Sequence, residues 1–161
     1  METDVLRIRE ASSQLDYEGS RRLFEEYASA IGFDLGFQGF DQEVASLPGE
    51  YASARGCILL AESGGALRGC VALRALSAEV CEMKRLYVRP EWRGLGIGRA
   101  LAMAVVAAAR VRGYSRMRLD TVAGMVEARR LYESLGFREI APYRHNPLEG
   151  ACFFEFELGE P

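Results

Sequence analysis

The chain has 161 residues, 49% of them apolar, with a net charge of -3 and an isoelectric point near 5.4. This length suits one domain with one sizeable core and is short for two typical domains. The acidic balance provides no extended basic surface, so we expect no nucleic-acid partner. No apolar run approaches the roughly 20 residues of a membrane span, and the polar N-terminus is unlike a signal peptide. We therefore expect a cytoplasmic protein without a membrane partner.

The hydrophobic pattern alternates between strand and helix periods along the whole chain. In chain order we expect a strand at 6–9, a helix at 20–31, a short helix at 40–46 within an irregular region, strands at 57–62, 67–73 and 79–88, a helix from about 98 to 112, a strand at 116–121, a helix at 127–135, and strands at 137–140 and 152–158.

These elements predict an α/β (α+β) fold in the order β-α-α-β-β-β-α-β-α-β-β. The turn residues at 63–66 indicate a hairpin, so the three strands between 57 and 88 form an antiparallel meander. The strand, loop, helix and strand from 79 to 121 form a parallel crossover. We expect a mixed, mostly antiparallel sheet of six to seven strands flanked by four helices, in a single domain over residues 1–161.

A glycine-rich turn joins the strand that ends at 88 to the helix after it. Gly94, Gly96 and Gly98 are two residues apart, and without a Cβ their consecutive N–H groups can converge on one point. The helix expected to begin near Gly98 adds unpaired donors and the positive end of its dipole. Arg93 and Arg99 flank the turn and can contact a diphosphate. The turn is therefore a predicted phosphate-binding loop.

The spacing of the three glycines excludes some classes of phosphate ligand. No Lys followed by Ser or Thr comes after the last glycine, so the P-loop pattern fails, and the three glycines lack the spacing of the dinucleotide fingerprint. The loop also lies past the midpoint of the chain. Asp120 ends the next predicted strand, where a ribose-binding carboxylate would stand in a dinucleotide site. A nucleotide-dependent oxidoreductase is therefore the second hypothesis.

The loop carries a family resemblance. Arg93, two residues, Gly96, one residue and Gly98 resemble the pyrophosphate loop of the GCN5-related N-acetyltransferase (GNAT) family, which reads Arg or Gln, two residues, Gly, one residue, Gly or Ala. The segment 84–88 resembles the fourth strand of that family, and 128–137 resembles its fourth helix and the start of the next strand.

One position departs from the family pattern. Many members have Asn three residues before the alanine of the second motif, and Met125 stands there in this chain. Any cofactor contact that this Asn makes elsewhere is therefore not expected here.

The resemblance implies an acetyl-CoA-dependent N-acetyltransferase. It places the diphosphate on residues 93–98, the pantetheine arm along 86–88 in the manner of an added strand, and the thioester between Leu86 and the strand at 116–121. A backbone N–H near Leu86 would polarise the thioester carbonyl. The implied cofactor-binding residues are Leu86, Tyr87, Val88, Arg93, Gly94, Leu95, Gly96, Ile97, Gly98 and Arg99.

The implied reaction is direct attack by a primary amine of a small molecule or peptide on acetyl-CoA in a ternary complex. Glu82 is the candidate general base, and Tyr132 is the candidate general acid for the departing thiolate. Glu82 also fits a half-exposed strand carboxylate paired with Lys84 or Arg85, and Tyr132 also fits a core aromatic residue. A non-catalytic acyl-CoA binding module is the alternative from another functional class.

Charge offers a prediction about the acceptor. Residues 1–60 hold 11 acidic side chains and 5 arginines, whereas residues 61–161 hold 12 acidic and 15 basic side chains. Acidic and aromatic residues gather where the family builds its acceptor pocket, which favours a cationic amine, although a solvated acidic helix face explains them equally. The candidate substrate-binding residues are Phe33, Phe37 and Tyr143, of which Tyr143 also fits a plain polar loop.

The remaining reactive side chains exclude a histidine-rich metal site. Four cysteines stand in or beside predicted strands without metal-ligand spacing, and His145 is the single histidine. We expect buried, reduced thiols and no metal cofactor. The sequence leaves a homodimer open.

Overall fold

The computed structural model describes residues 5–32, 35–36, 39–52 and 54–159. Its elements are β1 (Arg7–Glu10), α1 (Gln14–Ile31), α2 (Phe40–Ala45), η2 (Gly49–Tyr51), β2 (Cys57–Ser63), β3 (Ala66–Ala75), β4 (Val80–Val88), η3 (Pro90–Trp92), α3 (Ile97–Val111), β5 (Arg116–Val122), α4 (Val126–Leu135), β6 (Arg138–Ile140) and β7 (Ala151–Glu157).

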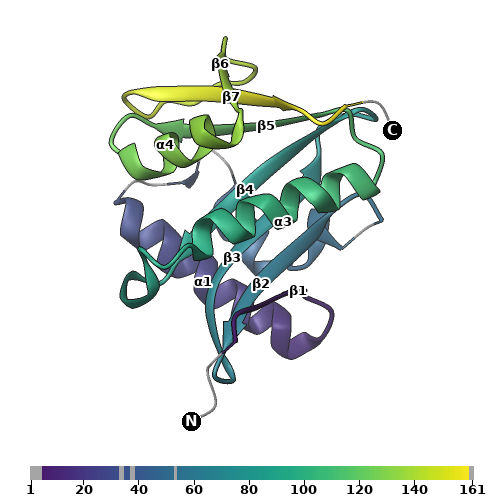
Figure 1. Ribbon diagram of the computed structural model, residues 1–161, viewed down its shortest axis with the longest axis vertical. Coiled ribbons are helices and arrows are strands. Elements are labelled where there is room, and N and C mark those ends of the chain that lie inside the picture. Colours follow the sequence, from purple (N-terminus) through teal and green to yellow (C-terminus); the bar gives the residue numbers. More distant parts are fainter. Residues whose placement is uncertain (1–4, 33–34, 37–38, 53, 160–161) are drawn as a thin grey trace.

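One seven-stranded sheet in the order β1-β2-β3-β4-β5-β7-β6 runs through the molecule, with helices on both faces (Figure 1). Neighbouring strands of this sheet are antiparallel, except that β4 and β5 are parallel. Helix α3 connects these two strands, as the crossover pattern predicted. The predicted order of elements and the mixed, mostly antiparallel sheet are confirmed.

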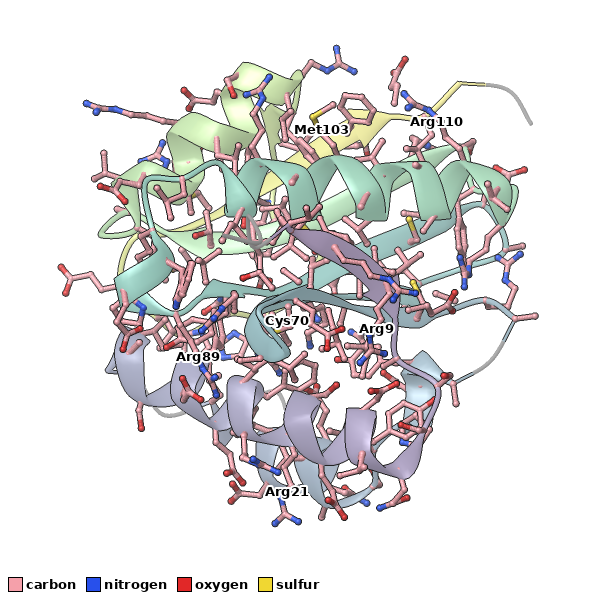
Figure 2. All side chains as sticks on the ribbon, turned by 60° about the horizontal axis from the view of Figure 1, so that its bottom comes forward. Arg9, Arg21, Cys70, Arg89, Met103 and Arg110 are labelled. Atoms are coloured by element: carbon pink, nitrogen blue, oxygen red, sulfur yellow. The ribbon has the colours of Figure 1, made fainter. Side chains whose placement is uncertain are left out.

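Each face of the sheet has its own core. Helices α1 and α2 cover one face and α3 covers the other, as the edge-on view of the sheet shows (Figure 2). Along β2, Leu59 packs in the core beneath α3, whereas Ile58 and Leu60 pack against α1 and α2. Both faces are buried, so the strand reads as an unbroken apolar run.

Helix α1 begins six residues earlier than its apolar spacing predicted. Ser13 caps it, since the Ser13 hydroxyl accepts from the Asp16 N–H at 3.1 Å and the Asp16 carboxylate accepts from the N–H of Ser13 at 3.3 Å. Asp16 also pairs with Arg9 of β1 at 2.8 Å, and this guanidinium lowers the pKa of the carboxyl. The first turns are polar, so only the capping box indicates this start.

Two further expectations can be compared with the described residues. The cysteines Cys57, Cys70, Cys81 and Cys152 are free and buried, as predicted. No described helix is long and apolar enough to cross a membrane.

Candidate active site

The site forms where the parallel strands β4 and β5 separate. They pair over three residues, from Val80 with Arg116 to Glu82 with Arg118. Beyond that point, residues of both strands line a cavity between them, Leu86 from β4 among them. The backbone of β4 after Glu82 therefore borders an opening in the sheet.

A β-bulge reshapes β4 at this opening. The ladder with β3 advances three residues on β4, from Lys84 to Tyr87, against two on β3. Arg85 takes the left-handed backbone conformation, with φ of 60°, which is costly for a side chain other than glycine. Its guanidinium donates to the Glu43 carboxylate of α2 at 2.9 and 3.1 Å. The ion pair and the bulge together fix the direction of β4 beside the cavity.

The glycine loop begins a groove that leads into this opening. Gly94 and Gly96 have φ of 77° and 84°, and Gly96 caps α3 without a side-chain hydrogen bond. The helix begins at Ile97, one residue before the predicted start. Its first-turn N–H groups and the positive end of its dipole therefore lie at the groove, which suits a phosphate.

Eight of the ten predicted cofactor-binding residues line the groove: Leu86, Tyr87, Val88, Arg93, Gly94, Gly96, Ile97 and Gly98. Leu95 and Arg99 lie outside that lining. The Leu95 side chain is 66% exposed, and Arg99 donates to the Ser134 hydroxyl of α4 at 3.1 Å. Arg93 is anchored beside β4, because its Nε donates to the Val88 carbonyl at 2.9 Å.

Helix α4 supplies the opposite wall of the groove, and none of the ten predicted cofactor-binding residues lies on it. Met125 caps α4 without a side-chain hydrogen bond. The groove is lined on this side by Gly124, Met125, Val126, Glu127, Ala128 and Leu131. A helix predicted to begin close after Gly124, opposite the glycine loop, was the available signal.

A second cavity continues from the groove on the α1 side of the sheet. The two share residues from α1, β4, β5 and the start of α4, namely Tyr27, Ile31, Leu86, Val122 and Met125. The second cavity is lined further by Leu35, Met83, Lys84, Arg85, Leu119, Asp120, Thr121, Tyr132, Asn146 and Leu148. An extended ligand in the groove would therefore contact a smaller molecule in the second cavity, at the point where β4 and β5 separate.

Tyr132 of α4 lies at this meeting point. It lines the second cavity, is 7% exposed, and packs against Phe137 and Phe154 with ring centroids 5.7 and 6.3 Å away. Burial raises the pKa of the Tyr132 hydroxyl. The group is therefore protonated at neutral pH and can donate a proton or a hydrogen bond.

Glu82 is fully buried, and the half-exposed alternative for it is wrong. One carboxylate oxygen accepts from Arg74 Nε at 2.9 Å, and the other accepts from the Tyr143 hydroxyl at 2.6 Å and from Arg144. The bulge directs Arg85 to Glu43 instead. Glu82 does not belong to the lining of either cavity.

Asp120 of β5 lines the second cavity on the same face of the sheet. Its two oxygens accept from Arg144 at 3.3 Å and from the Asn146 amide at 3.0 Å. Arg144 thereby links Asp120 to Glu82 across the parting of the strands. From the sequence alone, Asp120 is predicted only as a ribose-binding carboxylate in the second hypothesis. Side-chain alternation from Glu82 and Arg118 was the signal that places it on this face.

Of the three predicted substrate-binding residues, the structure describes only Tyr143. Tyr143 donates to Glu82 and lies edge-on to Phe153 at 5.2 Å, and it is not part of the cavity lining. Phe33 and Phe37 lie outside the described residues. Burial and the neighbouring Glu82 carboxylate raise the pKa of Tyr143.

The acidic N-terminal half is largely neutralised by arginines. Glu26 pairs with Arg89, which lies beside α1 in Figure 2. Further ion pairs are Arg9–Asp16, Arg9–Glu62, Arg21–Glu25, Arg74–Glu50, Arg85–Glu43 and Arg112–Glu10. The charge asymmetry therefore gives no support to a cationic acceptor.

A sheet opened between two parallel strands, with a glycine-capped helix at one end of the groove, defines an acyl-CoA-type transferase fold. The model of the acetyltransferase (GNAT) family matches residues 16–137. The chain belongs to this family and is an acetyltransferase.

Two proteins of similar sequence and one solved structure of similar fold match this chain, over different shares of its length. An uncharacterized N-acetyltransferase of Schizosaccharomyces pombe is 40% identical over 148 residues, 90% of each chain. Human N-acetylaspartate synthetase is 40% identical over 95 residues, 58% of this chain and 32% of that protein. A solved Salmonella typhimurium structure with its cofactor acetyl-CoA has a TM-score of 0.76 at 19% identity and covers 98% of this chain and 96% of that one.

Gly96→Val tests the glycine loop as the diphosphate site. A ligand that binds the native state alone stabilises it by about 2.7 kcal/mol at a hundredfold excess over Kd, so CoA should raise the melting temperature of the wild type. The valine side chain would stand where the diphosphate approaches, and we expect the CoA-induced shift to disappear.

Gly113→Val is the matched control. Gly113 has φ of 85° against 84° for Gly96, and an added Cβ meets nothing within 4 Å at either position. Both variants should lose a similar amount of unliganded stability through backbone strain, but Gly113, beyond the far end of α3, should keep the CoA shift. A full CoA shift in Gly96→Val would exclude the loop as the site.

Proposed function

We propose that this acetyltransferase moves an acetyl group from acetyl-CoA to the primary amine of a small molecule by direct attack while both are bound. The observation that carries the proposal is the continuity of the long groove with the second cavity at Leu86. A cosubstrate in the groove and an acceptor in the cavity would meet there, so neither needs to leave before the other enters.

The groove suits the parts of acetyl-CoA in order. The diphosphate would bind at 93–98, and the two amides of the pantetheine arm would pair with the β4 backbone at 86–88. The acetyl thioester would then reach the bulge at Arg85. The similar fold of the Salmonella structure, which was solved with acetyl-CoA, supports acetyl-CoA as the ligand of the groove.

A small acceptor is favoured over a peptide. The second cavity is walled by α1, by the two strands and by the loop after β6, and its polar residues are mostly buried. The name of the human relative states a small product, N-acetylaspartate. The cavity itself has a volume of about 40 Å³, which gives room to the amine-bearing end of a small acceptor.

The attacking amine must lose a proton, and Asp120 is the better placed carboxylate. Asp120 lines the cavity, whereas both Glu82 oxygens accept hydrogen bonds from arginines and from Tyr143 outside the lining. We therefore propose Asp120 as the proton acceptor and Glu82 as a residue that positions it through Arg144. The assignment of Glu82 as the base itself stays a prediction.

Tyr132 is proposed as the group that donates to the departing thiolate. Tyr132 keeps its proton at neutral pH and lines the same cavity as Leu86, near which the sulfur of the thioester would lie. The presence of both a donor and an acceptor of protons favours an enzyme over a module that only binds acyl-CoA. Membership of the acetyltransferase family sets the oxidoreductase hypothesis aside.

The substitutions Asp120→Asn and Glu82→Gln distinguish the catalytic role proposed for one carboxylate from the positioning role proposed for the other. Loss of the base should lower kcat by roughly 10²-fold or more, so we expect this from Asp120→Asn with a melting temperature near that of the wild type. Glu82→Gln leaves Arg74 and Arg144 beside a neutral amide in a buried site, which should cost about 3–5 kcal/mol of stability.

Glu155→Gln is the control for loss of an ion pair on this face. Glu155 of β7 accepts from Arg118 at 2.8 Å and lies outside the cavity lining, so its kcat should stay within a few-fold of wild type. Steady-state thiol release and thermal melts give both quantities. If Glu82→Gln keeps its stability and loses the rate while Asp120→Asn is active, Glu82 is the base.

Tyr132→Phe tests the proton donor with almost no change in packing. A thiol has a pKa near 8.5, so its thiolate is a fair leaving group, and the donor should contribute roughly 10-fold to 10²-fold in kcat. Tyr114→Phe is the control, because Tyr114 is also buried and donates to the Arg55 carbonyl at 2.6 Å, away from both cavities. Full activity in Tyr132→Phe would make the residue a core aromatic only.

A further inference from the structure

Lys84 is the single lysine of the chain, which otherwise carries its positive charge on 19 arginines. It lies on β4 just before the bulge and lines the second cavity. Its side chain is 5% exposed. Lys84 therefore buries a compact ammonium, whereas the other cationic side chains of the protein are guanidinium groups.

The Lys84 ammonium is poorly satisfied. The nearest carboxylate oxygen, Glu43 Oε1, is 3.9 Å away, and the Glu43 carboxylate already accepts both hydrogen bonds from Arg85. Within the described residues, Lys84 Nζ donates no hydrogen bond of standard length. A buried charge in this state is costly unless a ligand completes its coordination.

The carboxylates around Lys84 accept hydrogen bonds from arginines. Arg85 pairs with Glu43, and the carboxylates of Glu82 and Asp120 pair with two more arginines. Arg74 also pairs with the exposed Glu50, so the cations of the cluster are Lys84, Arg74, Arg85 and Arg144, and its carboxylates are Glu43, Glu50, Glu82 and Asp120. Among the described residues of this cluster, Lys84 is therefore the one cation that donates no hydrogen bond to a carboxylate.

The same cavity carries a carboxylate, Asp120, on its β5 side. We propose that the acceptor is an amino acid, held by its carboxylate on Lys84 and by its amino group at Asp120 beside the thioester. This inference rests on the proposed function and names its substrate class. The carboxylate of such a zwitterion would accept hydrogen bonds from the Lys84 ammonium, and its amino group would lie at the proton acceptor.

The pKa of Lys84 offers a readout that does not depend on turnover. Burial and the neighbouring Arg85 lower this pKa to about 8. The charged groups that face the ammonium are Glu43 from α2, Arg74 from β3, and Glu82 and Arg85 from β4. Bound carboxylate favours the charged form, so it should raise the pKa of Lys84.

Kinetics with matched acceptors test the inference. We would compare kcat/KM for L-amino acids and for the amines left when their carboxylate is removed: phenylalanine with phenethylamine, and leucine with isopentylamine. We expect the best amino acid to exceed its decarboxylated partner by at least about 10²-fold, the scale of one charge-assisted contact of about 3 kcal/mol.

Lys84→Met should remove this preference. In this variant the ratio of kcat/KM for the best amino acid to kcat/KM for its decarboxylated partner should fall by about 10²-fold. Lys84→Arg, which keeps the charge, should restore part of the preference. Equal rates of wild type on amino acids and decarboxylated amines would overturn the inference and leave the proposed function standing.

NMR keeps the inference testable if no acceptor turns over. Protein labelled with [13Cε]lysine should give one lysine resonance, and its titration midpoint near pH 8 should rise by about one pH unit or more with a saturating amino acid. The decarboxylated amine should leave it unchanged. A resonance that ignores every amino acid would overturn the inference, whereas a shift without thiol release would contradict the proposed function alone.

Discussion

The separation of β4 from β5 is the constraint on which the rest of the structure depends. The strands pair for three residues and then separate, so that a groove and a cavity meet inside the sheet. Each side of the opening is held by buried charges. Arg85 forms an ion pair with Glu43 of α2 and stabilises the bulge in β4. Arg144 forms ion pairs with both Glu82 of β4 and Asp120 of β5, where the two strands separate.

These charges also explain why the opening does not close. Continued pairing of the strands would press Lys84 and Asp120 into an interior without room for a ligand or solvent, and buried charges tolerate this only when fully paired. Apolar residues of both strands, among them Met83 and Leu119, also reach the continuous core beneath α3. One face of the strands therefore contributes stability and the other keeps a polar cavity open.

The sequence predicted what depends on local spacing, and it missed what depends on distant partners. The glycine loop, the crossover and the helix with Tyr132 were all readable from short segments. The partners of Glu82 were not, since Tyr143 and Arg144 follow it by 61 and 62 residues. Alternation gives the face of Asp120 and Lys84 but not the cavity beside them. Whether Glu82 or Asp120 takes the proton is therefore a question that only the three-dimensional arrangement raises.

The central claim is that acetyl-CoA and the amine occupy the opening together. Initial rates over a grid of both concentrations, with intact-mass measurement after acetyl-CoA alone, test it most directly. Simultaneous binding predicts intersecting double-reciprocal lines and no acetylated protein intermediate. Parallel lines, together with an acetyl adduct that a subsequently added amine removes, would contradict the account.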